Sequence, residues 1–448
     1  MAKMSASEVL SRAKKDGLQL VELQFSDFLG RVKSVTITAE QLSESFDHGT
    51  WFDGSSIEGF ARIFESDMVL RPDASTYALL PGWSKEGNGA VARLICDVEL
   101  PDGEPFMGDP RTILRKVTKE AESMGYSYNV GPELEFFLFK RAENGSIDVS
   151  SRGNGDYFVL SMDETYEIKK KIIQTLSVMG IYTEMSHYEV ANNQHEINFR
   201  YGDAITTADN AMTFKYTVKK IAADFGYYAS FMPKPIYGVN GSGMHCHQSL
   251  FNTRGKNAFV DKKDPYGLSQ VAYQFIAGQL KHVREISAVI APTVNSYKRL
   301  TPGFEAPAYV CWARKNRSAL IRIPLISPGR EVATRAELRC PDPSSNPYLT
   351  FAVMLKAGLE GIKMKMKAPK PVEEDVFEFD DAKLAKYYID KLPSSLYEAI
   401  KLMEEGTVVK DVFGEHTFAR YRETKMMEWD DFRRTVTEWE LERYLEIV

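Results

Sequence analysis

The stretch SYNVGPELEFFLFK, residues 127–140, decides the fold of this chain. Its aromatic and aliphatic side chains predict a long, largely buried β-strand. Because successive side chains of a strand point to opposite faces, Glu133 and Glu135 share one face. Two carboxylates among apolar neighbours are costly unless a cation offsets their charge. The pattern therefore favours a metal site on this strand over the alternative, a solvent-facing sheet edge.

Two further segments offer ligands of the same kind. HYEVANNQHEIN, residues 187–198, predicts two strands joined at Asn192-Asn193, with Glu189 and Glu196 on neighbouring strands. The alternative is a pair of surface glutamates. In NGSGMHCHQS, residues 240–249, a strand after the glycine-rich turn would place His245 and His247 on one face. The alternative for each histidine is a satisfied core residue.

Glu337 and Arg339 repeat the spacing of two residues near the end of an arginine-rich region. Carboxylates with a single imidazole suit Mg²⁺ or Mn²⁺ better than Zn²⁺. Such ions clamp nucleotide phosphates in phosphoryl transfer. Guanidinium groups bind phosphate and carboxylate in bidentate fashion. The alternative for each arginine is a solvated ion pair. Seven arginines belong to the region: Arg299, Arg314, Arg317, Arg322, Arg330, Arg335 and Arg339.

No G-x-x-x-x-G-K-[ST] or G-x-G-x-x-G phosphate loop occurs in the chain. The net charge of −6 provides no basic field for nucleic acid or an anionic membrane. No apolar run of about 18 residues is present, so no membrane span is expected. The four cysteines lie far apart, and the polar N-terminus lacks a signal sequence, which fits a reducing cytoplasm. The residues alone predict a cytoplasmic Mg²⁺- or Mn²⁺-dependent enzyme acting on ATP and a carboxylate.

Helices and strands mix without strict alternation, which predicts an α+β fold. The turn PDGEP at 101–105 predicts a domain boundary, giving domains 1–104 and 105–448. The segment 363–381 reads as a surface loop. The C-terminal segment 428–448 predicts a helix with Trp429, Phe432, Val436 and Trp439 on one face. That face would pack on the chain's own core or on another subunit.

FDGSSIEGF at 52–60, NGSGMHCHQS and NSYKRLTPGFEAP at 295–307 resemble signatures of type I glutamine synthetase, and the resemblance covers essentially the whole chain. It implies a β-grasp domain and a catalytic domain whose curved antiparallel sheet forms a funnel. It also implies a homo-dodecamer of two stacked hexamers with active sites shared between subunits. The implied reaction ligates ammonia to L-glutamate through γ-glutamyl phosphate, with two or more Mg²⁺ or Mn²⁺ ions and ATP as substrate.

The resemblance also implies roles for individual residues. The metal ligands would be Glu135, Glu189 and Glu196 for one ion and Glu133, His245 and Glu337 for the other. ATP would contact Tyr201, His247, Ser249, Arg317, Arg322 and Arg335. Glutamate and ammonium would contact Asn240, Gly241, Arg299, Glu305, Arg339 and Ser56. Asp53 of a neighbouring subunit would deprotonate ammonium, Glu305 would close a flap over the intermediate, and Arg317 would bind phosphate.

Regulation and alternatives follow from the same resemblance. Phe377 stands where adenylylated relatives have tyrosine, so no adenylylation is expected. Arg62 matches a subgroup in which an arginine supports feedback inhibition by glutamine; the alternative is a surface ion pair. Relatives also respond to PII-like regulators. Ligation of glutamate to a larger amine, a catalytically silent assembly protein and an unrelated metal-dependent kinase are the competing hypotheses.

Overall fold

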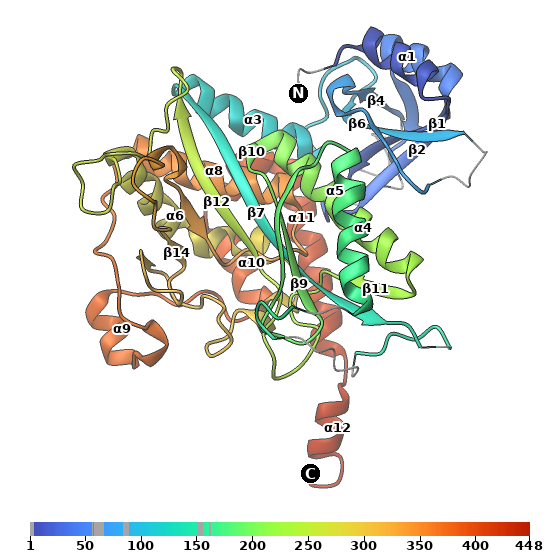
Figure 1. The fold of residues 1–448 in the computed structure, drawn as a ribbon. Helices are drawn as coiled ribbons and strands as arrows, with labels where there is room; N and C mark the ends of the chain where they lie inside the picture. The colour runs from blue at the N-terminus through green and yellow to red at the C-terminus, as the bar shows by residue number, and fades with distance from the viewer. Residues whose placement is uncertain are drawn as a thin grey trace.

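The computed structural model describes residues 4–55, 57, 67–83, 89–142, 144–149, 156–160 and 163–448. Its N-terminal part forms a sheet in the order β2-β1-β6-β4-β3, with β5 also pairing with β6. The parallel pair β1–β6 lies between antiparallel neighbours. The elements are α1 (Ala6–Lys15), β1 (Leu18–Ser26), β2 (Val32–Thr38), α2 (Leu42–His48), β3 (Thr50–Asp53), β4 (Asp67–Pro72), β5 (Ala78–Leu79) and β6 (Ala90–Glu99), with short 3-10 turns at Ala39–Gln41 and Ala74–Thr76. Figure 1 shows this part, in blue, at one corner of the molecule.

The second sheet carries the long strand predicted at 127–140, which is β7 (Tyr126–Lys140). Its strand order is β13-β14-β15-β12-β7-β9-β8, and β10 and β11 also pair with β7. Every pairing is antiparallel except β13 with β14, so the expected antiparallel sheet is mixed at that edge. The strands are β8 (Thr183–Tyr188), β9 (Gln194–Phe199), β10 (Gly202–Asp203), β11 (Tyr227–Ser230), β12 (Met244–Asn252), β13 (Trp312–Ala313), β14 (Ile321–Arg322) and β15 (Ala336–Leu338).

Helices cover one face of this sheet and bury its apolar side (Figure 1). At the centre of that layer, α6 and α8 lie backbone to backbone. A Cβ on Gly278 of α6 would lie 2.2 Å from the Ala357 carbonyl oxygen, and one on Gly361 of α8 would lie 2.0 Å from that of Gln274.

The helices are α3 (Pro110–Ser123), α4 (Glu164–Val178), α5 (Ala204–Asp224), α6 (Gln270–Ile290), α7 (Ser296–Arg299), α8 (Pro347–Lys363), α9 (Asp381–Tyr387), α10 (Leu396–Glu405), α11 (Val408–Arg434, kinked at Gly414) and α12 (Glu438–Tyr444), with 3-10 turns at Glu331–Ala333 and Val376–Glu378. None of the described helices combines the length and apolarity needed to cross a membrane.

Two predictions from the sequence need correction. The C-terminal helix is broken after Arg434, because Thr437 starts α12 with a capping box to Glu440. Trp429 and Phe432 therefore pack together on α11, whereas the Trp439 side chain is 58% exposed on α12. The segment 363–381 is not simply a surface loop either, since Val372, Val376 and Phe379 are buried in a small apolar cluster.

A buried guanidinium joins the N-terminal sheet to the helices of the second part. Arg111 of α3 is 2% exposed and contacts three carboxylates. Its Nη1 lies 2.5 Å from Asp97 of β6, and its Nη2 lies 2.8 Å from Asp73 and 2.9 Å from Asp209 of α5. Arg115 pairs with Asp73 and Asp97 as well, but from a position near solvent. Arg111 is therefore the central contact of this junction.

Replacing Arg111 with methionine should lower the free energy of unfolding by roughly 3–5 kcal/mol, because three carboxylates would lose a buried partner. Urea denaturation at matched subunit concentration measures the loss. The matched control is Arg115→Met, whose half-exposed pairs should cost below about 1 kcal/mol. Equal losses in the two variants would contradict the central role of Arg111.

Asp109 caps α3 directly before Pro110, the residue types that helix starts prefer at these two positions. Its carboxylate accepts hydrogen bonds from the Thr112 backbone N–H at 3.0 Å and from the Thr112 hydroxyl at 2.8 Å. Burial and the nearby Asp97 raise the pKa of Asp109 from 3.8 to about 7. A carboxyl whose pKa is raised in the folded state stabilises the fold below pH 3.8 and loses that contribution as the pH rises to about 7.

The variant Asp109→Asn should keep the cap but lose this titration. Between pH 5 and 7.5 the wild type should therefore lose about 2 kcal/mol of unfolding free energy relative to the variant. Parallel urea titrations at the two pH values measure the difference. A difference between the proteins that is constant with pH would show that the pKa of Asp109 is not raised.

Candidate active site

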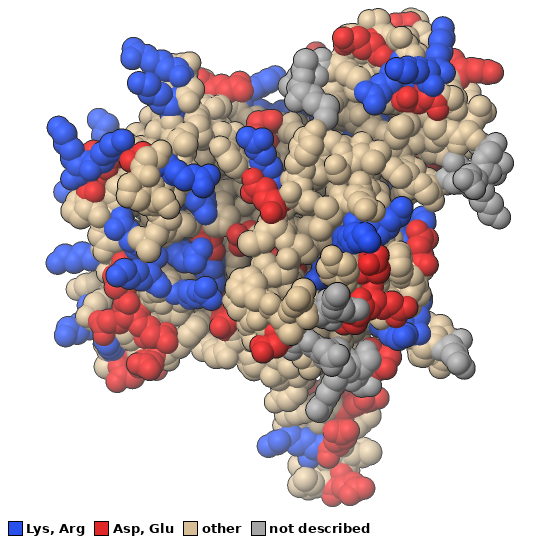
Figure 2. All heavy atoms as spheres, viewed as in Figure 1, with Lys and Arg blue, Asp and Glu red and all other residues tan. Residues whose placement is uncertain are grey.

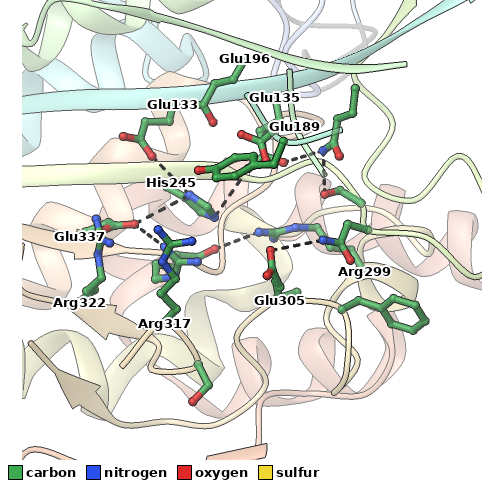
Figure 3. Close-up of a pocket in the computed structure, with 18 of the residues that line it drawn as sticks. Glu133, Glu135, Glu189, Glu196, His245, Arg299, Glu305, Arg317, Arg322 and Glu337 are labelled. Atoms are coloured by element: carbon green, nitrogen blue, oxygen red, sulfur yellow. Dashed lines mark hydrogen bonds and ion pairs between the residues drawn. The ribbon is translucent and has the colours of Figure 1, made fainter. Parts of the chain in front are cut away.

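The strand register brings the predicted ligands onto one face of the second sheet. His245 of β12 lies opposite Glu133 of β7, and Glu135 of β7 lies opposite Glu196 of β9. At the outer positions, Glu337 of β15 lies opposite His247 of β12. Figure 3 shows Glu133, Glu135, Glu196, His245 and Glu337 converging in one cavity. Segments separated by some 200 residues in sequence thus supply a single site.

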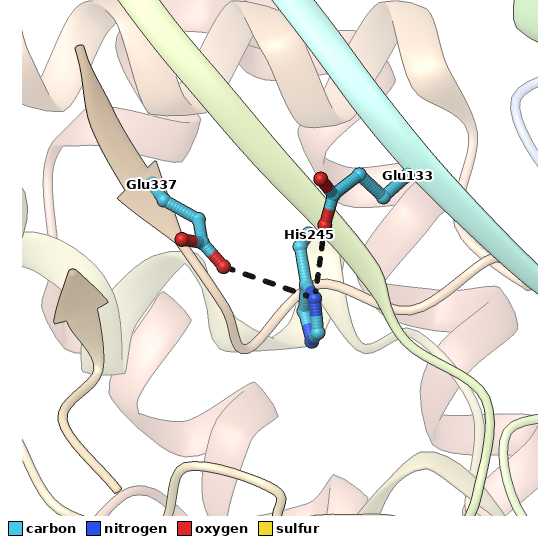
Figure 4. A group of neighbouring side chains, drawn as sticks. All are labelled: Glu133, His245 and Glu337. Atoms are coloured by element: carbon cyan, nitrogen blue, oxygen red, sulfur yellow. Dashed lines mark ion pairs between the residues drawn. The ribbon is translucent and has the colours of Figure 1, made fainter. Parts of the chain in front are cut away.

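The first group of potential metal ligands is Glu133, His245 and Glu337 (Figure 4). Each offers a ligand atom, and these atoms all lie within 4.8 Å of one another. The Nδ1 atom of His245 is 3.4 Å from Glu133 Oε2 and 3.9 Å from Glu337 Oε1. This is the set that the resemblance assigns to one ion.

The second group contains a residue that the sequence analysis missed. It consists of His187, Glu189 and Glu196, with donor atoms again within 4.8 Å. The imidazole of His187 lies between the two carboxylates, 3.3 Å from Glu189 and 3.5 Å from Glu196. The hairpin was predicted, but His187 rather than Glu189 lies directly opposite Glu196. The sequence did contain a signal for His187 as a ligand, because His187 and Glu189 are two residues apart and so lie on one side of an extended chain.

Glu135, the third expected ligand of that ion, lies between the two groups. Its Oε2 accepts hydrogen bonds from Gln194 Nε2 at 2.8 Å and from the Gly243 backbone N–H at 3.0 Å. Its Oε1 is 3.9 Å from His245 Nε2. Gln194, also missed in the sequence, therefore fixes the orientation of the Glu135 carboxylate and leaves Oε1 toward the cavity.

The carboxylates of the cavity differ in how far nearby positive charge offsets their burial. Burial, followed by the charges of Glu135 and Glu196, raises the pKa of Glu189 to about 9. Burial also raises the pKa of Glu135. Burial opposes ionisation of Glu337 too, but His247, Arg339 and His245 hold its pKa at about 2. A divalent cation would relieve the crowding around Glu135 and Glu189, so the residues present fit a metal site.

Arg322 and Arg339 hold Glu337 from two sides. Arg322 Nε donates to one carboxylate oxygen at 2.5 Å, and Arg339 Nη1 donates to the other at 2.7 Å. Arg317 lines the cavity with an exposed side chain. Arg314 points elsewhere, with its guanidinium 4.6 Å from the Tyr266 ring centroid. The arginine-rich region thus divides between the site and the surrounding structure.

Arg299 has a largely structural environment. It is 3% exposed, and its Nη1 and Nη2 donate to the backbone carbonyls of Cys340, Pro341 and Arg339. The glycines of the 240–243 turn permit this packing. A Cβ on Gly243 would lie 2.5 Å from Arg299 Nη2, and one on Gly241 would lie 2.1 Å from the Pro233 carbonyl oxygen.

His247 belongs to a second cavity beside the first. Arg335 Nε donates to His247 Nδ1 at 3.1 Å, and His247 Nε2 lies within hydrogen-bond distance of Glu133 Oε1, at 2.8 Å. The cavity has a volume of about 450 Å³ and shares Glu133 with the first, and it brings together the predicted ATP contacts Tyr201, His247, Ser249 and Arg335. Glu184, absent from the sequence prediction, also lines it.

The first cavity has a volume of about 640 Å³. Thirteen predicted residues line it: Glu133, Glu135, Glu189, Glu196, Asn240, Gly241, His245, Arg299, Glu305, Arg317, Arg322, Glu337 and Arg339. Tyr157 and Phe158 line it too and were not predicted. Asp53, at the end of β3, is not among the described residues that line it. Ser56 and Arg62 lie outside the described residues.

Fold and site together define a class: a two-domain enzyme whose sheet carries potential metal-ligand clusters beside arginines suited to phosphate and carboxylate. Comparison with known proteins identifies the family. Residues 17–101 match the family model described as the glutamine synthetase beta-Grasp domain, and residues 107–444 match the glutamine synthetase catalytic domain. The chain belongs to the glutamine synthetase family, whose enzymes form glutamine from glutamate and ammonia with ATP.

Individual relatives span the chain almost completely. A glutamine synthetase of Methanosarcina mazei is 52% identical over 442 residues, which is 98% of each chain. One of Clostridium saccharobutylicum is 50% identical over 446 residues, or 99% of each. The solved structure of Plasmodium falciparum glutamine synthetase has a TM-score of 0.88 at 26% identity and covers 99% of both chains.

Replacing Glu337 with glutamine should raise the Mg²⁺ concentration needed for half-maximal activity by at least about 10-fold, because a ligand charge is lost beside His245. Activity against free Mg²⁺ measures the shift, and thermal unfolding confirms that the variant is folded. The matched control is Glu331→Gln, since Glu331 pairs with Lys262 near the surface. An unchanged Mg²⁺ requirement would mean that Glu337 serves only Arg322 and Arg339.

Proposed function

We propose that the first cavity joins ammonia to the side-chain carboxylate of glutamate, with ATP as the phosphoryl donor. The observation that carries the proposal is the single sheet face on which two carboxylate–imidazole groups meet two arginines. Glutamate and the γ-phosphate are both anions, so their approach needs fixed positive charge. A glutamate carboxylate oxygen attacks the γ-phosphorus, ADP leaves, and γ-glutamyl phosphate forms.

Two divalent cations, Mg²⁺ or Mn²⁺, would when bound neutralise phosphate charge and orient the nucleotide. Glu133, His245 and Glu337 would hold one of them. Glu135, Glu189 and Glu196 would hold the other. Support comes from the raised pKa values of Glu189 and Glu135, which mark an excess of buried negative charge. His187 lies within the second group and is a candidate to join it.

The remaining residues would bind substrates around these groups. Arg317 and Arg322 face the phosphates, and Tyr201, His247, Ser249 and Arg335 contact the rest of ATP in the adjoining cavity. Arg339, Asn240 and Gly241 hold glutamate. Arg299 contributes chiefly by supporting the backbone of residues 339–341, a role favoured by its three carbonyl acceptors.

The second step would replace phosphate with ammonia. Asp53, supplied by a neighbouring copy together with Ser56, attracts ammonium and takes its proton. Ammonia then attacks the acyl carbon, and phosphate leaves. The flap, residues 301–307 (TPGFEAP), closes over the intermediate with Glu305 and excludes water. Two observations support this role for the flap: Asn240 Nδ2 lies 3.4 Å from Glu305 Oε2, and Glu305 has a positive φ of 55°.

Sharing of Asp53 requires an oligomer, for which we propose two stacked hexamers in the cytoplasm. Figure 1 shows α12 projecting from the rest of the chain. Its apolar residues are exposed, with Trp439 at 58% and Leu441 at 44%, which suits contact with a second copy. Basic and acidic side chains are interspersed on the face shown in Figure 2. We place the domain boundary at residues 104 and 105.

Regulation remains a proposal as well. Phe377 lines the first cavity and offers no hydroxyl, which argues against adenylylation. We also propose that glutamine inhibits the enzyme by feedback through Arg62. A PII-like protein is the further regulator that we propose.

Phosphate release should require ATP, glutamate and ammonium together, and omission of any one should reduce it at least about 10-fold. Glutamine should be the product with ammonium, whereas putrescine should yield no adduct. Coupled phosphate detection and mass analysis of products provide the measurement. Phosphate release that does not depend on ammonium, or a putrescine adduct, would overturn the proposal.

A further inference from the structure

Lys234 contacts both the flap and the turn at residues 240–243, which we call the glutamate-binding turn. Two hydrogen bonds hold its backbone in place. The Lys234 backbone N–H donates to Asn295 Oδ1 at 2.7 Å, and Asn295 Nδ2 donates back to the Lys234 carbonyl at 3.1 Å. The residue is only 9% exposed. The base of this side chain is therefore fixed before any flap movement.

The side chain runs from this base past the turn. A Cβ on Gly241 would lie 3.3 Å from Lys234 Cδ, so the aliphatic stem packs against the Gly241 backbone. The ammonium group donates to the carbonyl oxygen of Val239 and lies 3.6 Å from the Phe304 ring centroid. Within the described residues, no carboxylate forms an ion pair with Lys234. The charge is thus directed at the ring.

Phe304 immediately precedes Glu305, the residue with the positive φ. A non-glycine residue in the left-handed region persists only where its surroundings fix it. Two contacts meet that need. Lys234 holds the ring of Phe304, and Asn240 donates to the carboxylate of Glu305 (Figure 3 shows Glu305).

We propose that Lys234 is a positioning residue of the flap, whose ammonium holds the Phe304 ring and thereby keeps Glu305 over the glutamate-binding turn. The inference rests on the proposed function of the flap. A cation over an aromatic face is favoured most where water is excluded, so the contact strengthens as the cavity closes. Losing it lets water compete with ammonia for γ-glutamyl phosphate, and phosphate is then released without glutamine.

The test is a double-mutant cycle with Lys234→Met, which keeps the stem, and Phe304→Leu, which keeps an apolar side chain. Each single variant should lower kcat/KM for ammonium and raise the phosphate-to-glutamine ratio by about 3- to 10-fold, the range of one partly desolvated cation–π contact. The double variant should be no worse than the more severe single variant, because both remove the same contact. Lys234→Arg and Phe304→Tyr should restore the ratio.

Two controls separate this effect from others. Lys219→Met removes a lysine 5.8 Å from the Phe231 ring, outside the first cavity, and should leave the ratio unchanged. Thermal unfolding of each variant separates loss of fold from loss of coupling. Losses that multiply in the double variant, or an unchanged ratio in folded single variants, would overturn the inference.

Glu305→Gln distinguishes failure of the inference from failure of the proposed flap. If Glu305→Gln raises the phosphate-to-glutamine ratio and the Lys234 and Phe304 variants do not, the flap role stands and the positioning role of Lys234 is wrong. If Glu305→Gln leaves the ratio unchanged, the proposed flap role itself is wrong.

Discussion

Repulsion among buried carboxylates is the constraint on which the catalytic part depends. Glu133 and Glu135 share a face because β7 is a strand, and antiparallel pairing adds Glu196 directly beside them. The chain separates the resulting charges into two environments. Glu337 is held ionised by histidines and arginines, whereas Glu189 and Glu135 are driven toward the neutral form. One side of the site therefore carries its own counter-charge, and the other is built to receive one.

The same separation explains the arrangement of cations and hydrogen-bond donors. Arg322 and Arg339 are tied to Glu337, so their positions are fixed before an anionic substrate arrives. Arg299 fixes the backbone of residue 339 through its carbonyl. Gln194 fixes Glu135 in turn. Preorganisation of this kind needs a rigid frame, which the backbone contact of α6 and α8 behind the sheet supplies.

The sequence predicted those features that depend on local pattern. The strand at 127–140, the hairpin at 187–198 and the Asp109 cap follow from alternation, a turn dipeptide and capping preference. The local pattern could not predict that His187 belongs to the second ligand group, because the pairing register decides which residue lies opposite Glu196. The environment of Arg299 did not follow either, since its acceptors come from residues some 40 positions away. The break before α12 was readable, because Thr437 and Glu440 have capping-box spacing.

The cavity and the junction between the two parts of the chain both bring carboxylates together, but they balance the negative charge in opposite ways. In the cavity, carboxylates outnumber the cations that face them, so the site retains affinity for a further positive charge. At the junction, Arg111 is buried among Asp73, Asp97 and Asp209, and no ligand is needed to complete it. A resident guanidinium gives a permanent contact, whereas carboxylates that exceed the positive charge facing them give an exchangeable site. The N-terminal sheet that carries Asp53 is thus attached by a contact that substrate binding does not have to form.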